Sequence, residues 1–367
     1  MSHSEQNNPA HTEQYSEPAQ TSEMELSIIL PARNEADVLP ACIASLLSQS
    51  EPGFELGAQW ELIIINDDST DASRQIAVEA AASHPGVTLI DAPPLDLKSS
   101  DALNGKNNAC WAGAQLARGK WLLFTDADTV HEPHNLSRAL HEADRHHVAL
   151  LSYSARQIVT GFWQRAVMPL VYSELASVYP PKQVSDPHSR LAAANGQFLL
   201  VERNAYFSTG GHRAQGTNVL EDVAIASSIK RGHLIRFRYA PEALSTRMYR
   251  TTRDMIEGWT KNLALLMPRP IYLAAWRVLD LLLFFGLPLL AFGIPWLVLW
   301  QKAAIMILWV RTVWRFYARV ARSNFPAADI AISIFGVPLF IYLLVRSAVD
   351  HNFRRSVTWK GRSYTTR

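Results

Sequence analysis

A run of apolar residues ends in two carboxylates that stand one residue apart. The run Leu122–Phe124 predicts a buried strand, and Asp126 and Asp128 follow its carboxyl end. Ligands of open α/β sheets bind at the carboxyl ends of the strands. Two hard carboxylate oxygens at such a place suit Mg²⁺ or Mn²⁺, and the ion would in turn hold a phosphate group. The segment therefore predicts a site for a metal ion and a phosphate.

Polar side chains also follow three other predicted strands. The first strand contains Pro31 and is followed by Glu35, and the second is followed by Asp67 and Asp68. A loop after the third strand leads to Lys106. Each of these segments alone is typical of a turn or a helix cap. Because parallel strands bring their carboxyl ends to one edge of a sheet, we expect the four strand ends to form one binding site.

The segments that carry these residues alternate between strand-like and helix-like patterns. This order predicts an α/β fold with a mostly parallel sheet and helices on both faces. The expected strands are Leu26–Ala32, Glu61–Asn66, Val87–Asp91, Lys120–Thr125 and Val148–Ser152. The expected helices are Ala36–Gln49, Asp71–Ser83 with Ser69 or Thr70 as N-cap, Lys106–Arg118, and a helix from Pro133.

The four strand ends, in this order, resemble the nucleotide-sugar half of a family 2 glycosyltransferase of the GT-A type. The resemblance covers about residues 26–262. It implies a glycosyltransferase domain at 25–262, with a nucleotide half at about 25–152 and an acceptor half at about 153–262. It implies that a UDP-sugar donor is bound by Pro31, Glu35, Asp67, Asp68, Lys106 and Asp126. Asp126 and Asp128 match the metal motif of the family, in which Asp128 would bind Mg²⁺ or Mn²⁺ directly.

The same resemblance assigns roles farther along the chain. Glu221-Asp222 matches a Glu-Asp pair in which the aspartate is the general base, so both are candidate catalytic residues. Asn195-Gly196-Gln197 and Gly210-Gly211-His212 match segments that frame the acceptor pocket. A base opposite the leaving group implies a single displacement with inversion. The first turn of a helix also explains Glu221-Asp222, and His212 is equally well explained as a structural residue.

One difference from the family's motifs limits which of its members the chain resembles. Processive members of the family carry Gln-x-x-Arg-Trp before the first membrane helix, and this chain lacks that motif. By this comparison Trp259 would lie under the acceptor, and Arg250 or Lys261 would hold the diphosphate. The segments Arg247–Arg250, Glu257–Asn262 and Trp359–Arg362 look most like hopene-associated and carotenoid-type membrane glycosyltransferases. The implied function is inverting, metal-dependent transfer of a sugar from a UDP-sugar to a membrane lipid.

Other functions explain fewer of these residues. Thr125–Thr129 mimics the nucleophile loop of haloacid-dehalogenase-like phosphatases, but no Gly-Asp-x-x-x-Asp follows it. The first strand is not followed by the Gly-x-Gly-x-x-Gly of NAD-binding folds. A catalytically inactive, membrane-anchored protein that binds a nucleotide sugar is the remaining alternative. We expect His131 and His134, which follow the metal motif, to cap a helix or face solvent.

Composition separates a soluble part from a membrane part. The net charge of +2 provides no basic field for nucleic acid, and two cysteines, Cys42 and Cys110, make no disulfide framework. Residues 1–24 are polar and predict a disordered arm. The last hundred residues are apolar and aromatic, and predict a membrane region at 271–350 followed by a basic tail at 351–367.

The membrane region contains two long apolar stretches. Leu281–Trp300 is uncharged and long enough to span a bilayer, and Ile330–Val345 is a shorter second stretch. Between them, Arg311, Arg315 and Arg319 share one face of a helix expected at Ala303–Val320, which is typical of a membrane interface. Basic residues flank each stretch and predict two to four spans in the cytoplasmic membrane, with the catalytic domain facing the cytoplasm.

Overall fold

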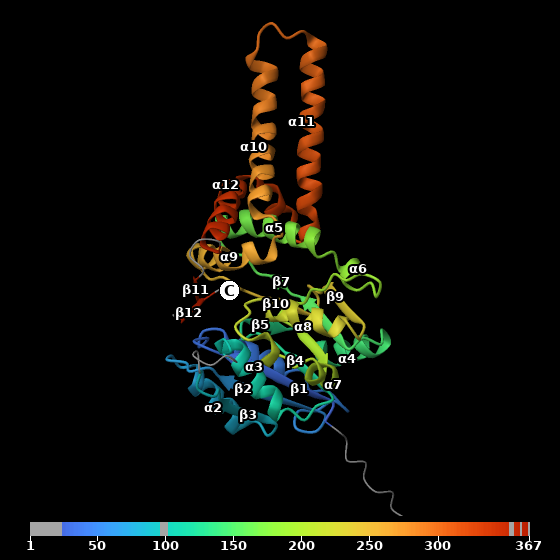
Figure 1. Ribbon diagram of the computed structural model, residues 1–367, viewed down its shortest axis with the longest axis vertical. Coiled ribbons are helices and arrows are strands. Elements are labelled where there is room, and N and C mark those ends of the chain that lie inside the picture. The colour runs from blue at the N-terminus through green and yellow to red at the C-terminus, as the bar shows by residue number, and fades with distance from the viewer. Residues whose placement is uncertain (1–23, 96–101, 352–355, 360–361, 366–367) are drawn as a thin grey trace, which may run out of the picture.

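A central sheet is built as the sequence predicts. The structure is a computed structural model that describes residues 24–95, 102–351, 356–359 and 362–365 (Figure 1). Its largest sheet has the strand order β3-β2-β1-β4-β8-β6-β9. The bounds are β1 Leu26–Ala32, β2 Trp60–Asn66, β3 Val87–Asp91, β4 Trp121–Phe124, β6 Leu150–Ser154, β8 Leu199–Glu202 and β9 Ile235–Tyr239. Among the described strands of this sheet only β8 runs antiparallel to its neighbours, so the mostly parallel sheet is confirmed.

Helices cover both faces of this sheet, because its strands are apolar on both sides. Along β1, Ile28 and Leu30 belong to one buried cluster and Ile29 belongs to another, as the two-residue period of a strand requires. One face is covered by α1 (Leu39–Leu47), α2 (Ser73–Ser83) and α4 (Asn135–Arg145). The other is covered by α3 (Gly105–Leu116), α7 (Arg203–Ser208) and α8 (Glu221–Lys230). The α/β class with helices on both faces is therefore confirmed.

Several helix starts differ from the prediction. The prediction of Ser69 or Thr70 as N-cap is wrong, because α2 begins only at Ser73. The Asp71 carboxylate instead accepts the backbone N–H of Ser73 at 2.9 Å. α1 begins at Leu39 rather than at residue 36, since Pro40 suits the first turn of a helix. α4 begins at residue 135 rather than 133.

A second layer joins the large sheet to the apolar C-terminal helices. It contains a small sheet of β5 (Thr129–His131), β10 (Leu244–Thr246) and β7 (Arg156–Gln157). Next to it lie α5 (Phe162–Val178), α6 (Pro181–Val184) and α9 (Thr252–Leu266). Two short 3₁₀ turns, η1 (Arg213–Gln215) and η2 (Ala321–Ser323), complete the connections. α5 and α9 share a third buried cluster with the C-terminal helices, so the two parts of the chain pack as one body.

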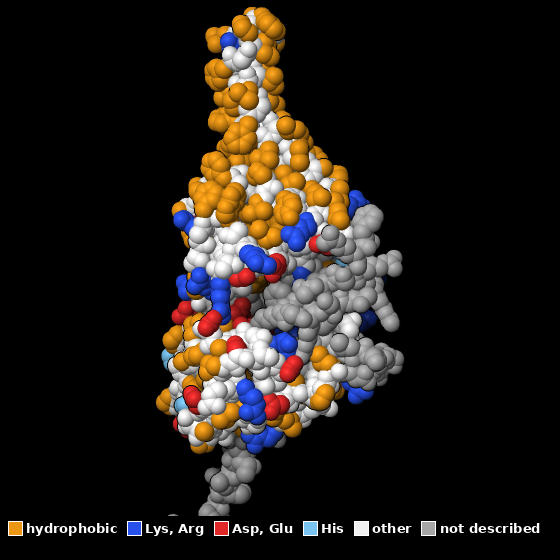
Figure 2. Space-filling view, turned by 90° about the vertical axis from the view of Figure 1, so that its left-hand side faces the viewer, with side chains coloured by type: hydrophobic (Ala, Val, Ile, Leu, Met, Phe, Trp, Pro, Cys, Tyr) orange, Lys and Arg blue, Asp and Glu red, His pale blue; other side chains and the backbone are white. Residues whose placement is uncertain are grey.

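The C-terminal helices are α10 (Pro270–Gly293), α11 (Leu299–Val320) and α12 (Ala327–Val349), followed by β11 (Ser356–Trp359) and β12 (Arg362–Thr365). α10 and α11 form a hairpin that rises far beyond the rest of the molecule (Figure 1). On the face shown in Figure 2, most of the side chains along it are hydrophobic. In the described residues α10 and α12 are long and apolar enough to cross a membrane, which is weak evidence for membrane association.

The expectation that Leu281–Trp300 forms one membrane span is wrong. α10 ends at Gly293, and the chain turns through residues 294–298 before α11 begins at Leu299. Pro288 is accommodated inside α10, whereas Pro295 follows the end of the helix, where its missing N–H costs no hydrogen bond. Residues 1–23 of the predicted polar arm lie outside the described residues, as do Arg354, Arg355 and Lys360 of the basic tail.

Candidate functional site

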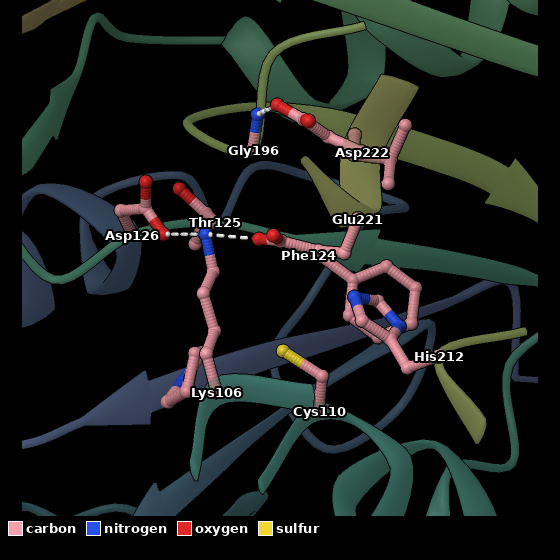
Figure 3. A pocket seen from close by; sticks show the side chains of 11 residues that line it. Lys106, Cys110, Phe124, Thr125, Asp126, Gly196, His212, Glu221 and Asp222 are labelled. Carbon is pink, nitrogen blue, oxygen red and sulfur yellow. Dashed lines mark hydrogen bonds and ion pairs between the residues drawn. The ribbon is translucent and has the colours of Figure 1, made fainter. Parts of the chain in front are cut away.

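A pocket opens at one edge of the large sheet, where the carboxyl ends of β1 and β4 meet the first turns of α3 and α8. Figure 3 shows its side chains converging from these elements and from the loops before β8 and η1. Its lining residues are Pro31, Lys106, Cys110, Phe124, Thr125, Asp126, Gly196, Leu199, His212, Glu221 and Asp222. Residues predicted from segments more than 100 positions apart in the sequence are therefore brought together.

Lys106 links two carboxylates across the pocket. Its Nζ lies 2.9 Å from Asp126 Oδ1 and 2.9 Å from Glu221 Oε1 (Figure 3). Partial burial disfavours the ammonium, but the charges of Asp126 and Glu221 outweigh it and hold the pKa of Lys106 well above its usual range. The cation is thus fixed between the metal motif and the Glu-Asp pair. A phosphate group that entered here would meet a preformed positive charge.

Asp222 stands opposite Lys106 and is held by two backbone groups. Its Oδ2 accepts the N–H of Gly196 at 2.9 Å, and its Oδ1 accepts the N–H of Val223 at 2.7 Å. Burial, together with the charge of Glu221, raises the pKa of Asp222 to about 7. A carboxylate with such a pKa is suited to accept a proton near neutral pH. The pair does occupy the first turn of α8, so a favourable place at a helix start and a place in the pocket are compatible.

His212 lines the pocket as a neutral ring. It is 2% exposed, its Nδ1 lies 2.9 Å from Tyr206 Oη, and it packs against Phe124. Burial, and then the charge of Lys106, lower the pKa of His212 to about 3. Gly211 beside it has φ +48°, and a Cβ there would lie 2.3 Å from the Tyr206 ring. His212 and Gly211 are therefore both required by the local packing, and His212 also lines the pocket.

The ends of β1 and β2 lie at the same edge and add residues that the sequence reading passed over. Arg33 donates to the carbonyl oxygen of Asp67 at 2.7 Å and to that of Asp68 at 3.0 Å, and so joins the two strand ends. Glu35 donates its backbone N–H to Ser73 Oγ at 2.8 Å. Only the position of Arg33 directly after an apolar strand could have indicated this role. Nothing in the sequence indicated that Cys110 also lines the pocket. Burial strongly raises the pKa of its thiol, so the thiol stays protonated and unreactive.

The comparisons with known proteins show which family and which fold the chain is similar to. The model of glycosyl transferase family 2 matches residues 27–199. Residues 27–199 are thus similar to a glycosyl transferase family 2 domain. A 4,4'-diaponeurosporenoate glycosyltransferase of Staphylococcus haemolyticus is 27% identical over 359 residues, 93% of this chain and 88% of the relative. The protein of that name in Staphylococcus aureus strain USA300 is 26% identical over 65% of this chain and 60% of its own length.

A solved structure shares the fold of the family 2 domain. A mannosyltransferase from Pyrobaculum calidifontis, in complex with GDP-Man and Mn2+, superposes with a TM-score of 0.51. The match covers 92% of this chain and 91% of the other, at 16% identity. The GT-A fold is thus supported by the family model and by the structural likeness.

Two of the proposed acceptor-side residues lie outside the pocket of the family 2 domain. Arg250 forms an ion pair with Asp37 at the surface. Trp259 is 3% exposed and donates from Nε1 to Met168 Sδ at 3.2 Å, inside the third buried cluster. It shares one face of α9 with Met255 and Leu263, and this face is directed into the protein. The pocket-lining roles expected of Arg250 and Trp259 are therefore not seen in the structure.

Lys261 and Asp128 approach from the side of α9. Burial lowers the pKa of Lys261 to about 8, while the nearby charges of Glu221 and Lys106 act on it in opposite directions. Lys261, rather than Arg250, is thus the second cation close to the carboxylates. Burial, and then the charge of Asp128, raise the pKa of Tyr249, so Asp128 lies toward the layer between the sheet and α9. Asn195 donates from Nδ2 to Gln197 Oε1 at 3.0 Å in the loop that holds Asp222.

His131 connects the metal motif to this loop, and the expectation that it caps a helix or faces solvent is wrong. It is 3% exposed, and Asn135 donates from Nδ2 to His131 Nδ1 at 3.2 Å. Since an amide nitrogen only donates, the proton of the imidazole is assigned to Nε2, which donates to Thr125 Oγ1 at 3.1 Å. Thr125 in turn donates to the carbonyl oxygen of Gln197 at 2.9 Å. Burial lowers the pKa of His131 to about 3, so the ring stays neutral.

Replacing His131 by Phe should destabilise the domain, because Thr125 and Asn135 would each lose a buried partner. Such a loss costs about 1–3 kcal/mol, and each kcal/mol lowers the melting temperature by roughly 2–4 °C in a domain of this size. Thermal unfolding of the full chain in detergent measures the change. The control is His141→Phe on the exposed side of α4, for which we expect almost no shift. Equal melting temperatures of the two variants would contradict the network.

Proposed function

We propose that the chain transfers a sugar from a UDP-sugar to a lipid acceptor, with inversion at the anomeric carbon. The observation that carries the proposal is the Asp222 carboxylate, which two backbone N–H groups hold in a pocket that also contains Lys106 and Asp126. A base and a cation in one pocket are what transfer from a nucleoside diphosphate requires. The base takes the proton of the acceptor hydroxyl, and the cation stabilises the charge on the leaving diphosphate.

The positions of the other residues support separate roles in binding the nucleoside, the diphosphate and the acceptor. Pro31 and the ends of β1 and β2, with Glu35, Asp67 and Asp68, would hold the nucleoside. Lys106 and Lys261 would neutralise the diphosphate from two sides. Gly196 keeps space for Lys106, since a Cβ there would lie 2.8 Å from its Nζ. Asp222 would then reach the acceptor from the side of the loop 195–197, and a base placed opposite the leaving group gives inversion.

A divalent metal fits this donor set only together with the substrate. Within the described residues no group of three or more His, Cys, Asp and Glu side chains could hold an ion. Asp126 and Asp128 offer hard oxygen ligands, and Mg²⁺ typically binds one or two carboxylates and completes its shell with phosphate and water. We propose that these two residues hold Mg²⁺ or Mn²⁺ when the donor is bound. The ion would supply charge neutralisation of the departing diphosphate.

Two observations support a lipid acceptor and a membrane location. The curated relatives carry the name of a 4,4'-diaponeurosporenoate glycosyltransferase, and the α10–α11 hairpin exposes large apolar side chains. Arg311 and Arg315 lie exposed in the half of α11 nearer the catalytic domain. By the positive-inside rule this arrangement favours a catalytic domain on the cytoplasmic face of the cytoplasmic membrane.

The test uses the full chain reconstituted in membrane lipid with a panel of UDP-sugars. Active transfer should release UDP and add the mass of one sugar residue to a lipid, as seen by intact-lipid mass spectrometry. Incubation without a UDP-sugar is the control for background lipid masses. Binding of the donor without any release of UDP would support the alternative, a catalytically inactive nucleotide-sugar-binding protein.

The pH profile of kcat/KM should be bell-shaped. Asp222 acts only when deprotonated, so activity should fall below its raised pKa of about 7. Lys261 holds the diphosphate only when protonated, so activity should fall again above its lowered pKa of about 8. Lys261→Arg should shift the alkaline limb upward, because a guanidinium does not titrate in this range. A profile that is flat from pH 6 to pH 9 would contradict both assignments.

A further inference from the structure

We propose that the chain enters the lipid bilayer through the α10–α11 hairpin, and that α12 does not cross it. α12 would instead lie at the base of the hairpin, with its C-terminal end on the same side as the catalytic domain. The proposal depends on the membrane location proposed above but not on the transfer reaction. It concerns a helix that by length and composition alone would count as a span.

α12 is embedded in the protein to a far greater extent than α10. In the most apolar window of each helix, 44% of α12 is buried inside the protein against 17% of α10. The buried residues form a stripe with helical spacing: Asp329, Ser333, Ile334, Gly336, Val337, Phe340, Leu343, Leu344, Ser347 and Ala348. Four of these are polar or lack a side chain, and a lipid-facing surface would not need them. The stripe is a protein contact surface.

Both ends of α12 are bonded to helices of the catalytic part. Near its start, Asp329 Oδ1 accepts from Arg165 Nε on α5 at 2.6 Å. Near its end, Ser347 Oγ accepts the backbone N–H of Ala264 on α9 at 2.8 Å. The two bonded positions are 18 residues apart, or about 27 Å along a helix. A helix that crosses a bilayer has its ends on opposite sides, whereas both ends of α12 are attached to one domain.

The middle of α12 lies directly on the backbone of α5. A Cβ at Gly336 would lie 2.3 Å from the carbonyl oxygen of Ala166. Figure 1 shows α5 running across the base of the hairpin rather than alongside it. α12 also packs extensively against α5 and α9 as well as α10, so it lies at the junction between the hairpin and the catalytic part.

The position of the C-terminal strands leads to the same result independently. Figure 1 shows β11 and β12 beside α9, on the catalytic side of the hairpin. The hairpin leaves this side and returns to it. A crossing by α12 would place β11 and β12 beyond the membrane, away from α9. Within the described residues that follow the hairpin, α12 therefore makes no further crossing.

The hairpin itself has the surface of a membrane-inserted element. Large side chains on it are strongly exposed, among them Leu289 at 73%, Phe292 at 72% and Trp296 at 81%. Residues 281–328 contain no Asp or Glu, while the basic residues there are Lys302, Arg311, Arg315, Arg319 and Arg322. This charge is complementary to anionic lipid head groups. A lipid bilayer is thus the occupant that the hairpin fits.

Buried ion pairs connect the base of the hairpin to α5 of the catalytic part. Arg277 on α10 lies 2.9 Å from Asp280 Oδ2 and 3.4 Å from Glu174 Oε1 on α5. Arg319 on α11 lies 2.9 Å from the same Asp280 carboxylate. The hairpin therefore has a defined direction relative to α5, and the bilayer would meet the protein at this level.

The first test asks which segment binds the bilayer. The full chain should float with vesicles of phosphatidylcholine and phosphatidylglycerol in a density gradient. Leu289→Lys with Phe292→Lys should abolish flotation, since both side chains are exposed on the hairpin. Leu116→Lys with Leu234→Lys is the matched control on the exposed surface of the catalytic domain, and it should float normally. Unchanged flotation of the hairpin variant would overturn the proposal.

The second test determines the side on which α12 ends. The native Cys42 and Cys110 are buried, so a membrane-impermeant maleimide would report an introduced cysteine. Asp144→Cys marks the catalytic domain and His351→Cys marks the end of α12. In sealed vesicles both should be labelled from the same side. Label on His351→Cys only from the opposite side would overturn the proposal. Neither test uses donor or acceptor, so failure here is distinct from failure of the proposed reaction.

Discussion

Asp222→Asn should lower turnover by about 10²–10⁴-fold, the range that loss of a general base typically produces. The asparagine preserves the shape of the side chain, but its one carbonyl oxygen can replace only one of the two carboxylate oxygens that accept from Gly196 and Val223. It cannot take a proton from the acceptor hydroxyl. Because the carboxylate faces Lys106 across the pocket rather than the ends of β1 and β2, binding of UDP should change little. Steady-state rates and UDP calorimetry measure the two effects.

The control for this variant is Asp144→Asn, which makes the same exchange at an exposed position of α4. It should leave both turnover and donor binding unchanged. A variant Asp222→Asn that loses donor affinity and keeps its turnover would contradict the assignment. A loss of less than tenfold would contradict a hydroxyl acceptor and favour one that is already ionised at neutral pH, such as a carboxylate.

Asp128→Asn should reduce transfer by roughly 10²–10³-fold or more, since metal stabilisation of a leaving group contributes several kcal/mol and each 1.36 kcal/mol is a factor of ten. The amide removes the negative charge that would hold the ion beside the donor phosphates. Wild-type activity should disappear in excess chelator and return on addition of Mn²⁺ or Mg²⁺. Binding of Mn²⁺ in the presence of UDP, followed by electron paramagnetic resonance, gives a readout besides activity.

The outcome that would contradict the metal assignment is full activity of the wild type in excess chelator. In that case the charge on the diphosphate would be neutralised by Lys106 and Lys261 alone. Unchanged Mn²⁺ binding by Asp128→Asn would show that the ion is held elsewhere. Asp144→Asn is again a suitable control, because it alters the charge of the chain without touching the pocket.

Much of the central sheet could be predicted from local patterns. The bounds of Leu26–Ala32 and Val87–Asp91 are those of β1 and β3, since each is an apolar run between polar turns. The metal motif at Asp126 could be proposed because it directly follows a strand end, whereas the Glu-Asp pair at Asp222 was proposed only from the resemblance to the family. Lys106 was placed at the site because parallel strands direct their ends to one edge. The inferences about the strand ends need only the period of a strand and the direction of its chain.

Helix boundaries and side-chain partners depended on contacts that are distant in sequence. Because of their positions in a motif, Trp259 was expected under the acceptor and Arg250 was one of two residues expected to hold the diphosphate. The helical phase of α9 instead directs Trp259 toward Met168, while Arg250 finds Asp37 on another element. His131 lies in a network with Thr125, Asn135 and the carbonyl of Gln197. No local pattern distinguishes such a buried histidine from one that faces solvent.

The membrane region shows most clearly what the sequence determines and what only the tertiary structure determines. Composition by itself determined that two apolar segments follow a catalytic domain, because hydropathy is a property of the residues alone. Only the tertiary structure decided which of them faces outward: α10 exposes its apolar surface, whereas α12 buries a stripe against α5 and α9. The physical reason is that a buried helix and a membrane helix avoid water equally. Their sequences therefore look alike until the partner of the apolar face is known.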